Sequence, residues 1–302
     1  MLGAETIAAV LLRCYTESDR RVAEHMPQMR LFRKELIMPI HLTTITACDY
    51  ETIGRRMMTS GLDHVEELLS SKDGSILHAA KYILDPASGE RTVKVVYTLQ
   101  KAAEGVGLEL LDIDITLDGG EPVKLEFLKK LPQSSKANEY YDVEVVAGGQ
   151  HLQVETVNRN AVVEEITGTR RTVFCSVFPY QLSVYADMNE LNESLGFMKK
   201  DQDGKAVSPV LAETFAAPGM GWTKGDEDSS PYSVLVGMVR SIREVSMDVG
   251  GERLPFTVAM LDTALGPTPV AMSREVFDLE KLAPGKALIM NAYVKADFAP
   301  NL

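Results

Sequence analysis

Cysteine is scarce in this 302-residue chain, and the few thiols lie far apart. Cys14, Cys48 and Cys175 are an odd number, and no two are close in sequence. From this pattern we expect neither a dense disulfide framework nor a zinc site of the CxxC type. Separated, unpaired thiols are typical of a reducing compartment, so we expect a cytoplasmic protein.

Long apolar runs are also missing. The apolar stretch near the N-terminus covers only residues 7–12, and no run approaches the roughly 20 residues that cross a bilayer. Glu5 and no positive side chain precede that stretch, which is the wrong order for a signal peptide. We therefore expect no membrane partner.

Positive charge is in deficit. The chain has 31 Lys and Arg against 43 Asp and Glu, a net charge of −12. Nearly all of this excess lies before residue 232, because residues 232–302 hold seven basic and eight acidic side chains. A field of this sign repels phosphate backbones and disfavours nucleic acid as a partner.

Histidines are few and scattered, without HxxxH or HExxH spacing. We therefore expect no metal and no cofactor. What the chain does have is 45% hydrophobic and 25% charged residues, which is typical of a globular protein with a sizeable core. Its length favours two domains.

Hydrophobic periodicity predicts an α+β first domain over residues 1–198. Apolar residues at helical spacing predict helices near 4–29 and 49–70. Antiparallel strands are expected over 75–185, as three hairpins around the turn signals at 85–90, 118–120 and 148–149.

Two features follow the hairpin region. Asp187 and Glu190 have capping-box spacing, which predicts a short helix to about Phe197. Residues 199–231 are rich in Gly and Pro and are expected to be a linker. This segment holds the only tryptophan, Trp222, either an anchor for a partner or a residue packed between the domains.

Residues 232–302 predict a small β-module. Alternating strands are separated by turns at Gly250-Gly251 and Gly266-Pro267, Ser273 is expected to cap a helix to about Leu282, and a long strand follows over 288–298. This order resembles an OB-fold, a five-stranded barrel with a helix between its third and fourth strands. A fifth strand is missing, so the last strand bends into two, the upstream domain completes the barrel, or the module is not an OB-fold.

The OB-fold resemblance implies a groove for oligonucleotides lined by basic and aromatic side chains. Arg240, Arg243 and Lys295 are the candidates for a small basic binding strip, although a solvated face is the better interpretation because no positive excess accompanies them.

A second resemblance lies in the hairpin region. Asp112-Ile-Asp114-Ile-Thr116 is similar to the first motif of the haloacid-dehalogenase-like phosphatases. There the first Asp is the nucleophile and the second the general acid/base beside magnesium, roles that would fall to Asp112 and Asp114. Strand alternation instead predicts that both carboxylates lie on a solvent-facing side of the strand.

The sequence thus favours a binding or assembly protein without catalytic residues, whose partner is a protein or a second copy. The acidic first domain and the strand edges of an incomplete barrel motivate this hypothesis. The alternatives are a metal-dependent phosphatase-like hydrolase that uses Asp112 and Asp114, and single-stranded nucleic-acid binding by residues 232–302.

Overall fold

The computed structural model describes residues 65–101, 108–132, 134, 139–158, 165–195, 198–200, 206–209, 213–218, 232–249 and 252–298. Within these residues the chain is nearly all β, with one short helix, α5 (Met188–Ser194). The predicted α+β class is therefore wrong. The helix expected near 4–29 lies outside the described residues, and where the one expected over 49–70 should end the chain instead forms strand β1 (Glu67–Ser70).

The first sheet is antiparallel, in the order β1-β2-β3-β4. It contains β2 (Ile76–Leu84), β3 (Arg91–Lys101) and β4 (Leu108–Leu117). The predicted hairpin around residues 85–90 is confirmed as β2–β3. Its turn holds because the Asp85 carboxylate accepts from Ser88 and Gly89 adopts a positive φ of 71°.

The expected hairpin around residues 118–120 is wrong. β4 pairs with β3, whereas β5 (Pro122–Lys130) pairs with strands of a different sheet. Residues 118–120 thus carry the chain from one sheet to the next, with Gly119 at a positive φ of 101°.

The second sheet has nine strands, in the order β11-β12-β13-β14-β8-β15-β7-β6-β5. The remaining strands of this sheet are β6 (Glu139–Val145), β7 (Gln150–Thr156), β8 (Thr169–Tyr185), β11 (Ala216–Pro218), β12 (Ser233–Val249), β13 (Glu252–Thr263), β14 (Gly266–Met272) and β15 (Ala287–Phe298). β6 and β7 form the predicted hairpin around 148–149. β8 comes from the predicted first domain and β15 from the predicted C-terminal module, so one sheet includes strands from both.

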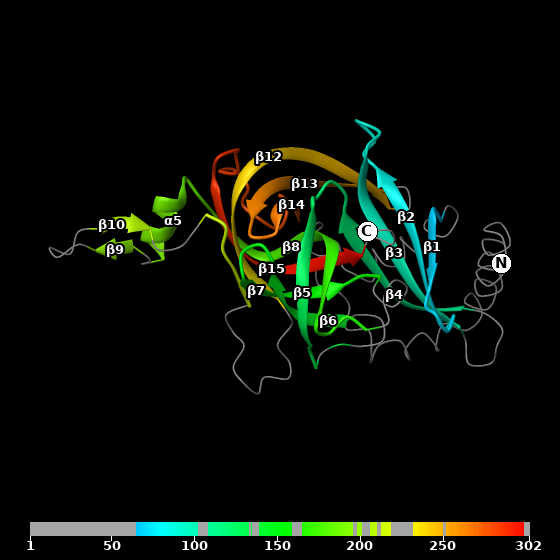
Figure 1. Ribbon diagram of the computed structural model, residues 1–302. Coiled ribbons are helices and arrows are strands. Elements are labelled where there is room, and N and C mark those ends of the chain that lie inside the picture. The colour runs from blue at the N-terminus through cyan, green and yellow to red at the C-terminus, as the bar shows by residue number, and fades with distance from the viewer. Residues whose placement is uncertain are drawn as a thin grey trace, which may run out of the picture.

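Two further pairings, β12–β15 and β8–β5, close this sheet into two rings of strands, here called circuits. The two circuits together are here called the barrel. The N-terminal circuit is β5-β6-β7-β15-β8, and the C-terminal circuit is β12-β13-β14-β8-β15. Both contain the antiparallel pair β8–β15, here called the central ribbon, which crosses the middle of the molecule with β12–β14 on one side and β5–β7 on the other (Figure 1).

The interiors of both circuits form one continuous apolar core. Alternate residues of β15 point into it, as the sequence predicts: Leu288, Met290, Ala292, Val294, Ala296 and Phe298. Between β14 and β15 the chain forms turns instead of the helix expected after Ser273. The Asp278 carboxylate accepts from the Glu280 N–H there, a local bond that competes with helix formation.

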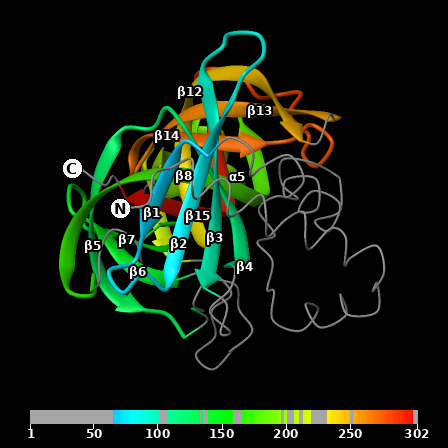
Figure 2. The same cartoon turned by 90° about the vertical axis from the view of Figure 1, so that its right-hand side faces the viewer.

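The first sheet packs its apolar face on the outside of the second. Val95, Tyr97 and Ile115 contact a cluster that includes Met247 and Phe256, which lie on the long β12–β13 hairpin. Figure 2 shows the first sheet lying across the barrel strands. The other face of the first sheet carries polar side chains beside a small apolar cluster that includes Ala80 and Val96, and it holds the candidate site.

The helix predicted from Asp187 and Glu190 is confirmed, although it ends at Ser194. The Asp187 side chain caps it by accepting from the N–H groups of Asn189 and Glu190. The helix is followed by a two-stranded sheet of β9 (Met198–Lys200) and β10 (Ala206–Pro209). These three elements, here called the arm, stand away from the barrel at one end of the molecule (Figure 1). At seven residues, α5 is far too short to span a bilayer, and no described helix qualifies.

Candidate functional site

Polar side chains line one face of the first sheet in register across its strands. His78 lies opposite Thr98, and Thr98 lies opposite Asp112. Two residues along β4, Asp114 occupies the same face. These four residues are at most 5% exposed, so this polar face is buried.

Lys295 of β15 forms the first centre of charge, and its side chain is completely buried. Its Nζ lies 2.7 Å from Asp114 Oδ1 and 2.6 Å from Glu155 Oε2. Asp114 lies on β4 of the first sheet and Glu155 on β7, so the ammonium joins the first sheet to the N-terminal circuit. Two buried carboxylates share one ammonium here.

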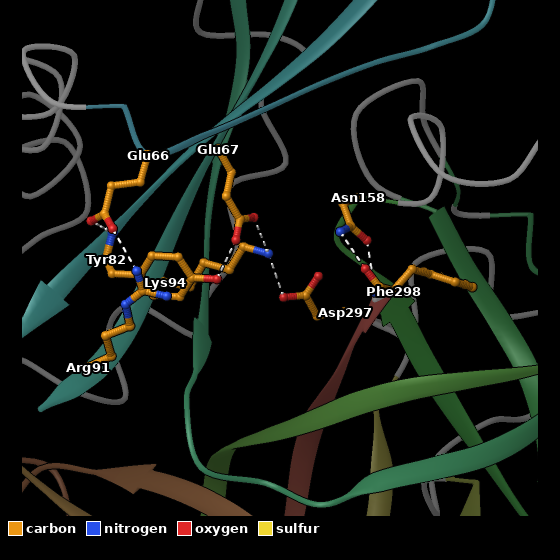
Figure 3. A network of polar contacts seen from close by, with 8 residues as sticks. All are labelled: Glu66, Glu67, Tyr82, Arg91, Lys94, Asn158, Asp297 and Phe298. Carbon is orange, nitrogen blue, oxygen red and sulfur yellow. Dashed lines mark hydrogen bonds and ion pairs between the residues drawn. The ribbon is translucent and has the colours of Figure 1, made fainter. Parts of the chain in front are cut away.

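Lys94 of β3 forms a second centre with the same composition. Its Nζ lies 2.9 Å from Asp297 Oδ2 and 3.1 Å from Glu67 Oε2. Figure 3 shows the Lys94 ammonium between these two carboxylates, with Arg91 beside the Tyr82 ring. Tyr82 donates to Glu67 at 2.6 Å, which orients that carboxylate.

The end of β15 is held by a third contact. The Asn158 side chain donates to the Phe298 carbonyl and accepts from the Phe298 N–H, each at 2.9 Å (Figure 3). Asp297 and Lys295 therefore lie on a strand whose end is fixed. The centres around Lys295 and Lys94 are here called the buried charge cluster.

Burial and neighbouring charge shift several pKa values in the cluster. Burial raises the pKa of Glu155, with Lys295 opposing the rise and Asp114 adding to it. Burial also raises the pKa of Asp297, against the opposing effect of Lys94. Burial works against both ammonium groups, but their carboxylates outweigh it, so the pKa values of Lys295 and Lys94 are raised.

His78 lies at the edge of the cluster. Its Nδ1 is 3.1 Å from Thr98 Oγ1, while its Nε2 is buried without a hydrogen-bond partner. Burial lowers the pKa of His78 to about 4, although Asp114 opposes this. The imidazole is therefore neutral at pH 7.

The buried charge cluster is suited mainly to holding strands together through ion pairs. Its ammonium groups stay protonated at neutral pH, and the Asp114 carboxylate is held by one of them. In the described part of the chain, no group of three or more His, Cys, Asp or Glu side chains has metal-binding geometry. The arrangement links strands from both sheets by charge-assisted hydrogen bonds.

The expectation that Asp112 and Asp114 face solvent is wrong. They are 5% and 3% exposed, because the polar face of β4 meets Lys295 of β15 rather than water. Strand alternation predicts correctly that the two share a face, but alternation cannot tell which partner covers that face.

The proposed basic strip is not assembled. Lys295 is buried in the cluster, whereas Arg240 and Arg243 are partly exposed. Arg240 pairs with Asp262 at 2.6 Å, and Arg243 lies 3.6 Å from Glu90. Trp222 lies outside the described residues.

Sequence reasoning missed most of the cluster. Glu67, Lys94, Glu155 and Asp297 carry no motif, and their separation in the chain is long. A weak signal exists, because Lys295 and Asp297 alternate with the core residues of β15. Charged residues on a strand that is otherwise mostly apolar indicate a buried partner.

Comparison with known proteins adds no relative. No family model matches the chain, and neither a curated protein nor a solved structure shows significant similarity.

Proposed function

We propose that this chain is a binding or assembly protein without catalytic activity, and that its ligand is a protein. The observation that carries the proposal is the ion pair between Asp114 and Lys295. A catalytic acid/base must reach the substrate, but Asp114 is 3% exposed and its carboxylate is held by a buried ammonium. We infer that Asp114 instead links the first sheet to the barrel through its ion pair with Lys295.

The arm supports the second part of the proposal. It projects from one end of the barrel, and α5 at its base packs through Met188 and Leu191 against apolar residues of β12 and β15. Residues 186–215 hold three lysines and six acidic side chains, so this segment is acidic. We expect its partner to present a basic surface.

The absence of catalysis is tested with a phosphatase screen in the presence of magnesium. We expect the wild type and Asp112→Asn to show the same background turnover of phosphomonoesters. Turnover in the wild type that the substitution abolishes would contradict the proposal and restore the hydrolase alternative.

The role of the arm is tested by affinity capture of the tagged full chain from its source cells. Leu195 at the end of α5 is 37% exposed, and Val276 on the barrel is 42% exposed. We expect Leu195→Arg to lose a protein that the wild type and the matched control Val276→Arg both retain. Equal capture of that protein by the wild type and both variants would argue against a binding role for the arm.

Nucleic-acid binding by residues 232–302 has less support. The outer side of β13 carries Leu254, Phe256 and Val258, and these pack against the first sheet. A gel-shift experiment on the full chain tests this alternative. Retardation of single-stranded oligonucleotides that disappears with added salt would favour it.

A further inference from the structure

The two circuits follow one pairing scheme. β5, β6 and β7 form an antiparallel meander, β8 pairs antiparallel with β5, and β7 runs parallel to β15. β12, β13 and β14 form the second meander, β15 pairs antiparallel with β12, and β14 runs parallel to β8. The chain therefore contains the same four-strand unit twice, at 122–185 and at 233–298.

The fourth strand of each unit is incorporated into the circuit of the other unit. β8 completes the C-terminal circuit between β14 and β15, and β15 completes the N-terminal circuit between β7 and β8. Neither unit closes with its own four strands. The central ribbon is thus an exchange of strands between the two units.

This exchange does not require both units to belong to one molecule. The backbone hydrogen bonds of β8–β15 and the ion pair between Lys295 and Glu155 form equally well between two copies, because the same residues meet. The two arrangements differ in the path of the connection between the units and in their dependence on protein concentration.

The connection is long enough for either route. β8 ends at Tyr185 opposite Ala287, and β12 begins at Ser233 opposite Ala292. These ends are about 20 Å apart at ordinary strand spacing. The part of the connection between α5 and β11 spans roughly 65 Å when extended, about three times that gap.

We propose that this chain dimerises by exchanging its two units, so that residues 122–185 of one copy close on residues 233–298 of a second copy. The partner in this exchange is a second copy of this chain, held through the central ribbon; it adds to the assembly function above and is separate from the basic partner expected at the arm. The antiparallel pairing of β9 with β10 in the arm also forms between two copies, since Lys200 and Ala206 meet in either arrangement.

Charge sets the conditions for this dimer. Each copy carries −12, so the two copies repel one another at low ionic strength. Added salt screens this repulsion, and we expect the dimeric fraction to rise with both salt and protein concentration.

A cysteine pair across the central ribbon distinguishes the two arrangements. Gln181 and Asn291 lie opposite one another at the exposed side of the ribbon, and their side chains are hydrogen-bonded at 2.8 Å. We replace both by Cys in the full chain, with Cys14→Ser and Cys48→Ser, and oxidise after refolding. Exchange between copies gives a covalent dimer on a non-reducing gel, whereas closure within one copy gives a covalent monomer.

A second pair serves as the matched control. Glu244 and Thr257 lie opposite one another within the C-terminal unit, so Glu244→Cys with Thr257→Cys gives a covalent monomer in either arrangement. We expect the ribbon pair alone to give dimers, in a fraction that rises with concentration during refolding. A covalent monomer at every concentration, with a monomeric mass by light scattering, would overturn the exchange. It would leave the proposal of a non-catalytic binding protein intact, because the phosphatase and capture experiments test that separately.

Discussion

Lys295 shows how much one residue depends on its surroundings. Its ammonium is completely buried, and its stability in the folded state depends on Asp114 and Glu155. A buried ion pair adds little net stability when complete, because desolvation offsets attraction. Removing one partner is different, since it leaves charge in the interior without compensation.

We predict that Lys295→Met lowers the free energy of unfolding by about 3–5 kcal/mol. The matched control is Arg240→Met, which removes an equally short but exposed pair with Asp262 and should change stability by about 0–1 kcal/mol. Urea denaturation measures both. Adding Asp114→Asn and Glu155→Gln to Lys295→Met should recover part of the lost stability. Equal losses of stability in Lys295→Met and Arg240→Met would contradict the prediction.

His78 gives a pH-dependent prediction. Its pKa in the folded protein is about 4, against 6.5 ordinarily. Between these values the unfolded chain binds a proton that the folded chain does not, so stability is lost as the pH falls through this window. We predict that the wild type loses about 2 kcal/mol more than His78→Gln between pH 7 and pH 5.

The comparison with His78→Gln isolates the histidine. Glu155 has a raised pKa and favours folding on acidification, but it is present in both proteins and cancels. Urea unfolding at the two pH values gives the difference. Parallel pH profiles for the wild type and the variant would show that the imidazole is not buried as described.

At the scale of the element, β12 depends on a position without a side chain. A Cβ on Gly237 would lie 2.9 Å from the Asp262 carbonyl oxygen and 2.9 Å from Thr263 Cγ2. The carbonyl belongs to the backbone of neighbouring β13, so it cannot move aside without disturbing the pairing. The close approach of these two strands therefore requires glycine.

We predict that Gly237→Ala destabilises the protein by about 1–3 kcal/mol through overpacking. Gly148→Ala is the control, because the nearest atom to its added Cβ is a flexible side-chain atom at 3.7 Å. We expect the control to stay within about 0.5 kcal/mol of the wild type. Thermal unfolding of both variants measures the difference, and a neutral Gly237→Ala would contradict the close packing.

Sequence patterns predict elements here better than they predict partners. The β2–β3 and β6–β7 hairpins follow from turn residues between alternating segments, because those signals act within a few residues. The Asp-Gly pair at 118–119 gives the same signal, yet its flanking strands enter different sheets. Pairing is decided by distant strands, which a local turn cannot specify.

The same limit applies to the candidate site. Alternation correctly assigns the core face of β15, but Lys295 and Asp114 are brought together by residues far apart in the chain. Alternation identifies two faces of a strand and does not say what covers each. The two charges were therefore expected in solvent and are instead buried together.

At the scale of the whole molecule, the described sheets depend on one another. Residues 232–302 include four strands of the C-terminal circuit, but β8 fills the place between β14 and β15. We predict that residues 232–302 alone show no cooperative thermal transition by circular dichroism, while the full chain does. A sharp transition in the isolated segment would show that it closes without β8.

The order of synthesis has a consequence for how this protein reaches its fold. β5, β6, β7 and β8 leave the ribosome before β15, yet their circuit closes only when β15 pairs with β7 and β8, and β15 begins more than a hundred positions after β8 ends. Until then, the exposed strand edges and apolar faces of a half-built ring are open to wrong pairing. Newly made chains are therefore the state in which this protein most needs a chaperone, and slowed translation through β9–β14 should increase its aggregation in cells.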